Sequence, residues 1–299
     1  MALLDASSGV EGTWSGILAD GPDLYVGDLG SGEGAVDGQL VRIDKSRGGV
    51  TILVPKGDTT AWELAADAES IFWLSPTEAR VQRVARTGGP TQLIAIDQAP
   101  SDSAEPSGIT VADGFVYWAA FGVWRRAAVG SSEAESDFQT GSSPASIAAG
   151  GTDDGFFLTD RDGWVYRKDT PSSVTTLARG GKPGALAVDS THVYWVDAAD
   201  ATVMRVSRQG GEVAQKLAEG GARPAGLALD ATHVYWTTRG GCDEGPACWS
   251  GSVSRIDKAG STEPELLAEG PWPVLDVAVD DAAVYFTTGP AGVVYRVAR

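Results

Sequence analysis

The only two histidines of the sequence, His192 and His233, are candidates for acid–base or metal chemistry, because imidazole can serve both near neutral pH. Both lie in the same word, THVYW, which occurs at 191–195 and again at 232–236. A metal pair would need further ligands, and the surrounding sequence suggests none. The repeated word therefore indicates two copies of one structural unit, with each histidine at the entry to a strand.

Cys242 and Cys248 are the only cysteines, and five residues separate them within one loop. A zinc site would require four ligands, so a disulfide that pins this loop is the favoured interpretation, with two reduced thiols as the alternative. A disulfide favours an oxidising compartment, and we therefore expect a periplasmic or extracellular protein. The first residues, MALLDASSG, lack the features of a signal peptide, so an exported form would carry its leader elsewhere or have lost it.

Two acidic, glycine-containing loops are candidates for calcium binding. Asp28, Glu33 and Asp37 lie in 27–38, and the word TDRDG occupies 159–163. Carboxylate-rich loops can bind calcium, but neither loop has the spacing of an EF-hand. We therefore expect solvated turns and no cofactor, with calcium as the alternative.

The charge of the chain limits its partners. Its 299 residues carry a net charge of −17, and its 23 lysines and arginines form no basic run. Nucleic-acid binding requires a basic patch, so that partner class is excluded. No apolar run reaches the roughly 20 residues of a membrane-spanning helix. The expected partner is a small molecule, sugar or peptide, or another protein, and we expect a monomer.

The unit that contains THVYW recurs along the whole chain. Its central aromatic residues lie 37 to 50 residues apart, and they are Tyr25, Phe72, Tyr117, Phe157, Tyr194, Tyr235 and Tyr285. Each unit holds short runs rich in β-branched and aromatic residues between Gly, Pro, Asp or Ser, which is the pattern of strands. Four strands per unit at this period are typical of a β-propeller blade. The sequence therefore predicts an all-β, seven-bladed β-propeller that spans 1–299 as a single domain.

The two ends of the chain predict how the ring closes. The seventh unit stops at VVYRVAR (293–299), after its third strand, and the first residues, ALLDASSG, resemble the fourth-strand word ELLAEG (265–270). We therefore expect residues near 2–6 to form the outermost strand of the last blade. Such pairing would remove a free sheet edge.

One arginine recurs in the third strand of every unit, and this regularity favours a repeated structural task, such as a surface or inter-blade ion pair, over a ring of functional arginines. The predicted positions are Arg42, Arg83, Arg125, Arg167, Arg205, Arg255 and Arg296. The aspartates that end most first strands are expected to form turns, because Asp accepts hydrogen bonds from the backbone two residues on.

The words VYWTT (234–238) and VYWVD (193–197) resemble the Tyr-Trp-Thr-Asp repeat of LDL-receptor-type propellers, and SVSRID (252–257) resembles the third strand of NHL-type and virginiamycin B lyase-type propellers. The lyase type has seven blades and fits better than the six-bladed receptor type. The lyase resemblance implies a catalytic histidine after a proline in a loop that enters a first strand. The matching places here read Pro106-Ser107, Pro144-Ala145, Pro183-Gly184 and Pro224-Ala225, so that activity is not expected.

Candidate ligand-binding residues lie on the loops that enter first strands and that join second to third strands. Trp14, Trp62 and Trp272 enter three neighbouring blades, and Trp249 lies in the loop of Cys242 and Cys248. Exposed tryptophans can form a stacking platform, whereas buried ones would fill seams between blades. Glu63 and Asp276 are candidate channel-lining acids, because not every unit shares them.

These observations favour a non-enzymatic ligand-binding or protein-binding propeller, with no catalytic residue assigned. The alternative is a propeller lyase or hydrolase with a catalytic constellation of its own. Titratable groups that converge at the channel mouth would favour the enzyme, whereas aromatic and neutral polar groups would favour the binding module. The sequence does not identify the ligand.

Overall fold

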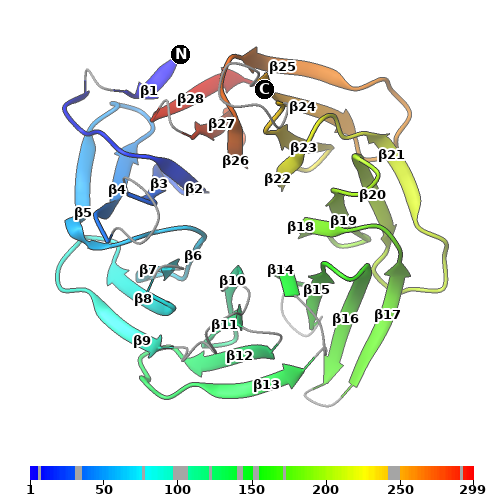
Figure 1. Ribbon diagram of the computed structural model, residues 1–299, viewed down its shortest axis with the longest axis horizontal. Helices are drawn as coiled ribbons and strands as arrows, with labels where there is room; N and C mark the ends of the chain where they lie inside the picture. Colours follow the sequence, from blue (N-terminus) through cyan, green and yellow to red (C-terminus); the bar gives the residue numbers. More distant parts are fainter. Residues whose placement is uncertain are drawn as a thin grey trace.

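The computed structural model describes residues 1–5, 8–30, 36–75, 78–96, 107–120, 123–139, 144–150, 155–170, 173–241, 250–289 and 292–299. Within them, 28 strands form seven four-stranded antiparallel sheets. Figure 1 shows the sheets as blades around a central axis, with one strand of each blade facing the centre and one at the rim. The predicted seven-bladed β-propeller is therefore confirmed. No helix in the described residues is long and apolar enough to cross a membrane.

Each blade is built from four consecutive strands, except the last. The innermost strands are β2 (Trp14–Asp20), β6 (Leu64–Ala66), β10 (Ser107–Ala112), β14 (Pro144–Ala149), β18 (Pro183–Val188), β22 (Pro224–Leu229) and β26 (Val274–Val279). The second strands are β3 (Asp23–Asp28), β7 (Ser70–Ser75), β11 (Phe115–Ala120), β15 (Phe156–Asp160), β19 (His192–Asp197), β23 (His233–Thr238) and β27 (Ala283–Thr288). The third strands are β4 (Gly38–Asp44), β8 (Arg80–Ala85), β12 (Val123–Ala128), β16 (Trp164–Thr170), β20 (Thr202–Ser207), β24 (Gly251–Asp257) and β28 (Val293–Ala298). The outermost strands are β5 (Val50–Thr59), β9 (Gln92–Ile96), β13 (Glu135–Gln139), β17 (Ser173–Arg179), β21 (Gln215–Glu219), β25 (Glu265–Gly270) and β1 (Ala2–Leu4).

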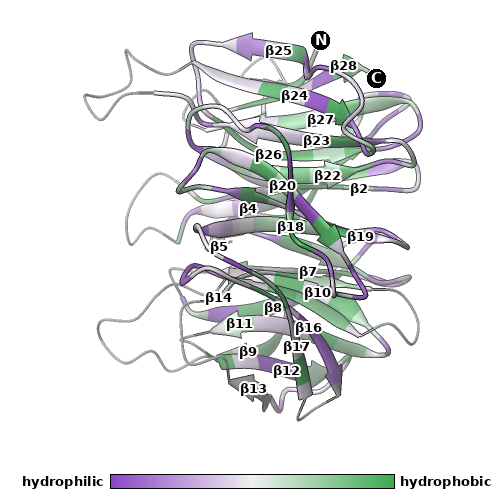
Figure 2. Cartoon of the chain, turned by 90° about the vertical axis from the view of Figure 1, so that its right-hand side faces the viewer, coloured by the Kyte–Doolittle hydropathy of each residue, from purple (hydrophilic) through white to green (hydrophobic). Residues whose placement is uncertain are grey.

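The hydrophobic core lies between adjacent blades. Both faces of a second strand meet a neighbouring sheet, so the aromatic words predicted from the repeat are buried on both sides. Tyr25 of blade one, for example, packs in one cluster with Ile71 and Trp73 of blade two. Seen from the side, the hydrophobic residues lie mainly along the strands (Figure 2). This packing holds the inner strands at fixed positions around the centre.

The N-terminal strand closes the ring, as predicted. β1 pairs antiparallel with β28, so the last sheet has the order β1-β28-β27-β26. Leu4 is fully buried in a cluster that also holds Trp14 and Val294. The first and last residues of the described chain therefore belong to the same blade.

Aspartates at the ends of first strands link neighbouring blades. The Oδ1 atom of Asp189 accepts hydrogen bonds from the amides of Thr191 and His192, both at 2.8 Å. Its Oδ2 atom binds Lys258 Nζ of the next blade at 2.8 Å and accepts a hydrogen bond from Tyr194. The predicted turn role is confirmed for Asp67, Asp189, Asp230 and Asp280, each of which accepts a hydrogen bond from the amide two residues on. The inter-blade contact is an addition to it.

The same inter-blade contact recurs at other seams with a cation that follows the third strand. The pairs are Lys45 with Asp280, Arg86 with Asp20, and Arg299 with Asp230. Among the described residues, these cations carry the ion pairs between blades, whereas the third-strand Arg255 forms a surface ion pair with Glu265 of its own blade, which is the other alternative predicted.

The third-strand arginines also reach the next blade, but through a backbone carbonyl. Arg42 donates to the carbonyl of Arg86 at 3.1 Å, and Arg167 donates to that of Arg208 at 2.8 Å. Their predicted structural role is confirmed. In blade three the prediction of Arg125 was wrong by one residue, because Tyr117 pairs with Arg126, as Tyr25 pairs with Arg42.

The two histidines hold equivalent places in blades five and six, as the repeat predicted. His192 opens β19 and His233 opens β23. The Nδ1 atom of each ring lies within hydrogen-bond distance of the preceding threonine, at 2.8 and 2.7 Å. Neither side chain lines the central cavity described below.

Candidate functional site

The central channel holds a cavity of about 630 Å³. Its walls come from the beginnings of the innermost strands and from residues that follow the second strands. Antiparallel pairing brings these two sets to the same face, since Pro224 pairs with Thr238 and Pro183 pairs with Asp197. This is the face on which the sequence placed its candidate ligand-binding residues.

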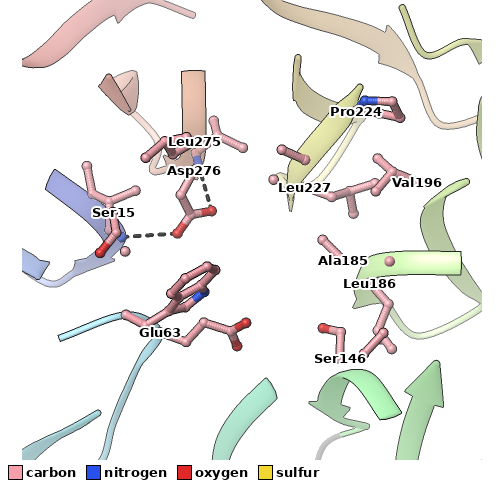
Figure 3. A pocket seen from close by; sticks show the side chains of 18 of the residues that line it. Ser15, Glu63, Ser146, Ala185, Leu186, Val196, Pro224, Leu227, Leu275 and Asp276 are labelled. Carbon is pink, nitrogen blue, oxygen red and sulfur yellow. Dashed lines mark hydrogen bonds between the residues drawn. The ribbon is translucent and has the colours of Figure 1, made fainter. Parts of the chain in front are cut away.

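Two of the residues that line the cavity are carboxylates, one directly before the innermost strand of blade two and one in that of blade seven. The strand register makes Glu63 of blade two and Asp276 of blade seven equivalent, because the residue after each one pairs with the residue that follows the central aromatic of the second strand, Leu64 with Trp73 and Val277 with Phe286. The corresponding residues in the other blades are small: Gly16, Gly108, Ser146, Ala185 and Gly226. Glu63 and Asp276 both line the cavity, and their side chains point into it from neighbouring places on one wall (Figure 3).

Both carboxylates accept hydrogen bonds from backbone amides. The Oδ2 atom of Asp276 accepts from the amide of Ile17 in the next blade at 3.0 Å, and Oδ1 accepts from its neighbour Val277 at 2.8 Å. Glu63 accepts from the amides of Gly108 and Ile109 in blade three. Each carboxylate therefore ties its own inner strand to the following one. A carboxylate has about four acceptor positions, so acceptor capacity also remains toward the cavity.

The surroundings raise the pKa of both acids. Burial raises the pKa of Glu63 to about 7, with a further contribution from the negative charge of Asp276. Burial likewise raises the pKa of Asp276 to about 6. Removal from water disfavours a charged carboxylate, and a second carboxylate nearby adds to the cost. Near neutral pH the carboxyl groups of Glu63 and Asp276 are therefore close to the pH at which they ionise.

Two arginines line the cavity on the side of blades four and six. Arg161 follows β15 and Arg239 follows β23, at equivalent places directly after the second strand. Both are exposed to the cavity, and neither makes an ion pair within the described part of the chain. Arg239 opens onto the cavity, but the surrounding channel wall removes it from much of the bulk water, and this desolvation, together with the nearby charge of Arg223, lowers its pKa.

Sequence reasoning missed both arginines, although a signal was present. Arg161 lies in the word TDRDG, which its carboxylates mark as a candidate calcium loop, and Arg239 lies in the word TTRGG (237–241). Alignment of the seven units on their second strands would have shown Arg161 and Arg239 at one shared position. The other described blades hold Leu29, Ala198 and Gly289 at this position. The repeat therefore does not require an arginine there, and the two arginines are candidates for a function.

Of the three predicted tryptophans that the structure describes, Trp62 alone lines the cavity. Trp14 is fully buried between blades one and seven, and its Nε1 atom donates to the carbonyl of Gly292 at 2.8 Å. Trp272 stacks on Tyr295, with ring centroids 5.4 Å apart, and lies over Gly270 of blade six. The structure therefore places Trp14 and Trp272 in seams between blades, which was the alternative to a shared platform.

The predicted disulfide between Cys242 and Cys248, the nearby Trp249, and the acid Glu33 lie outside the described residues. The other two acids of the blade-one loop are described. Asp28 is fully buried and accepts hydrogen bonds from the amides of Thr13 at 2.7 Å and Gly30 at 2.8 Å. No group of three or more His, Cys, Asp or Glu side chains among the described residues is placed to hold a metal.

No protein-family model and no curated protein matches the sequence. Solved structures do match. They include a virginiamycin B lyase from Staphylococcus aureus, with a TM-score of 0.77, 14% identity, and coverage of 98% of this chain and 97% of that chain. An extracellular domain from B. thetaiotaomicron matches with a TM-score of 0.70 and 12% identity, over 97% of this chain and 41% of that chain. A nidogen/laminin complex matches with a TM-score of 0.54 and 15% identity, over 66% of this chain and 76% of that chain.

These neighbours confirm the resemblance to known propellers at the level of the fold. Sequence identities this low do not assign a function to any individual residue, because proteins with unrelated activities share the propeller fold. The function of this chain must therefore be argued from the content of its own cavity: an aromatic ring, two carboxylates with raised pKa values and two arginines.

Proposed function

We propose that this protein is an exported binding module that holds a small charged ligand at the mouth of the central channel. The observation that carries the proposal is the asymmetry of the cavity wall. Glu63 and Asp276 stand where five other blades have Gly, Ser or Ala. Nothing in the repeat requires a carboxylate there, and burying one is costly. A cavity of about 630 Å³ lies in the range of small-molecule sites, roughly 300–1,000 Å³.

A carboxylate-based lyase or hydrolase is the second candidate, and one observation favours it. Titratable groups converge at the channel mouth, and the pKa of Glu63 is raised to about 7. A group that titrates near the working pH is suited to take up and return a proton. The first residues to test for such a role are Glu63 and Asp276.

A fragment screen by ligand-observed NMR tests the proposal and separates the two candidates. The channel variant is Ala185→Trp, since Ala185 lines the cavity from β18. The matched control is Ala282→Trp, on an exposed hairpin between β26 and β27. Fragments that bind the parent and the control, but not the channel variant, are the expected result.

Repeated spectra of the bound fragments then follow their fate. Fragments that stay unchanged over a day support a binding module, whereas new product resonances that vanish in Glu63→Gln support an enzyme. Fragments that bind Ala185→Trp as well as they bind the parent would place the site outside the channel. The melting temperature of each variant shows that loss of binding is not loss of fold.

A further inference from the structure

The charged residues of the cavity are segregated around the ring. The acids belong to blades seven and two, which flank blade one, and the arginines belong to blades four and six, which flank blade five. The wall formed by blades seven and two is therefore acidic, and the wall formed by blades four and six is basic; the two walls adjoin where blade six packs against blade seven. Leu186 and Val196 of blade five and Leu227 of blade six add apolar side chains on the basic side of the cavity (Figure 3).

None of the four charged side chains of the cavity forms an ion pair among the described residues, although the positive charge of Arg161 favours the ionised form of Glu63. Glu63 and Asp276 repel one another, because the charge of Asp276 disfavours ionisation of Glu63. Their hydrogen-bond partners are backbone amides, which do not neutralise a charge. Arg239 lies beside a second arginine, Arg223. A cation at the acidic wall and an anion at the basic wall would each relieve these costs.

Two glycines allow the residues of the acidic wall to pack closely against the neighbouring strands. A Cβ atom on Gly226 would lie 2.9 Å from both Cα and Oδ1 of Asp276, and one on Gly16 would lie 2.0 Å from the carbonyl oxygen of Trp62. The absence of side chains at these two positions allows the residues of the acidic wall to approach their neighbours. Trp62 adds an aromatic surface beside Glu63, and a tryptophan face attracts a cation.

Resting on the proposed function, we propose that the ligand is a dipolar molecule with a cationic group at one end and an anionic group at the other. The cationic group, an ammonium in the simplest case, binds between Glu63 and Asp276 against Trp62. The anionic group, a carboxylate in the simplest case, binds Arg161 and Arg239. Apolar residues of the cavity wall, among them Leu227, contact the middle of the molecule. Amino acids and short peptides with free termini belong to this class.

A series of unbranched ω-amino acids, from three to eight carbons, tests the proposal without knowledge of the natural ligand. Each is compared, by isothermal titration calorimetry, with the n-alkylamine and the n-alkyl carboxylate of the same carbon number. One chain length is expected to bind best, and about tenfold more tightly than either singly charged analogue, which corresponds to about 1.4 kcal/mol. An alkylamine or carboxylate that binds as tightly as the best ω-amino acid would overturn the dipolar assignment.

Two double variants assign the ends of the ligand. Glu63→Gln/Asp276→Asn should remove the advantage of the ω-amino acid over the carboxylate, and Arg161→Gln/Arg239→Gln should remove its advantage over the amine. The opposite pattern, or no change in either variant, would contradict the assigned orientation. The comparison of the three ligand series on the parent protein stays decisive if a variant does not fold.

The outcome is separable from that of the proposed function. Channel-bound fragments that carry a single charge, together with ω-amino acids that bind no better, would leave the binding module in place and overturn only the dipolar class. Binding of every probe to Ala185→Trp would overturn both.

Discussion

Glu63 and Asp276 make the stability of this protein depend on pH in an unusual direction. Their pKa values are raised from 4.5 to about 7 and from 3.8 to about 6. Between these limits the folded protein binds protons that the unfolded chain has released, so the free energy of unfolding falls as pH rises. Carboxyls with lowered pKa values, such as Asp189 and Asp230, contribute in the opposite sense and at lower pH.

We therefore expect Glu63→Gln/Asp276→Asn to gain stability relative to the parent as pH rises from about 4.5 to 7.5, because the neutral side chains do not ionise. Melting temperatures of both proteins across this range, taken as a difference, measure the effect and cancel the contribution of all other groups. Parallel curves would show that the two acids ionise in the folded protein as freely as in the unfolded chain.

Single residues were the least predictable feature from sequence. Glu63 and Asp276 were recognised because they break the repeat, and the same criterion applied to the second strands would have found Arg161 and Arg239. Trp14 shows the limit of this approach. Its position at the start of β2 suits either a channel contact or a seam, and the choice depends on the neighbouring blade, with which it forms the hydrogen bond to Gly292.

At the scale of the strand, the repeat predicted almost all of the structure, because four short strands per unit carry their own turn and core signals. The error at Arg125 has a simple physical origin. The word VWRR contains two adjacent arginines, and a shift of one residue turns a strand side chain to the opposite face. Only the pairing of Tyr117 with Arg126 resolves the choice.

The contact of Asp189 with Lys258 joins two blades through a partly buried ion pair, with 20% and 17% of the side chains exposed. We expect Asp189→Ala to lower the free energy of unfolding by about 2–4 kcal/mol, since it leaves Lys258 and two turn amides without their acceptor. Urea denaturation measures the loss. The control is Glu219→Ala, which removes the exposed pair with Lys216 and should cost less than about 1 kcal/mol. Equal losses would show that the inter-blade contact is no stronger than a surface pair.

At the scale of the whole molecule, the ring arrangement creates the candidate site. No single blade contains both an acid and an arginine of the cavity, and all four charged residues surround one cavity only when the seven sheets close into a ring. The sequence predicted this closure from the unpaired third strand at 293–299 and from the word ALLDASSG, because a strand edge left open would attract another chain. It did not predict which channel residues would face one another across the ring.

Closure depends on a strand of only three residues, and its buried anchor is Leu4, which is fully enclosed and pairs with Val294. We expect Leu4→Ala to lower the free energy of unfolding by about 2–5 kcal/mol through the cavity it leaves. Met1→Ala is the control, because Met1 is 75% exposed, and it should be neutral within about 0.5 kcal/mol.

Deletion of residues 1–5 should expose the edge of β28 and cause self-association, which light scattering detects. Since the acidic wall includes Asp276 of this same blade, the deletion should also weaken binding of the best ω-amino acid. A deleted protein that stays monomeric, with an unchanged melting temperature, would show that the ring closes without its N-terminal strand.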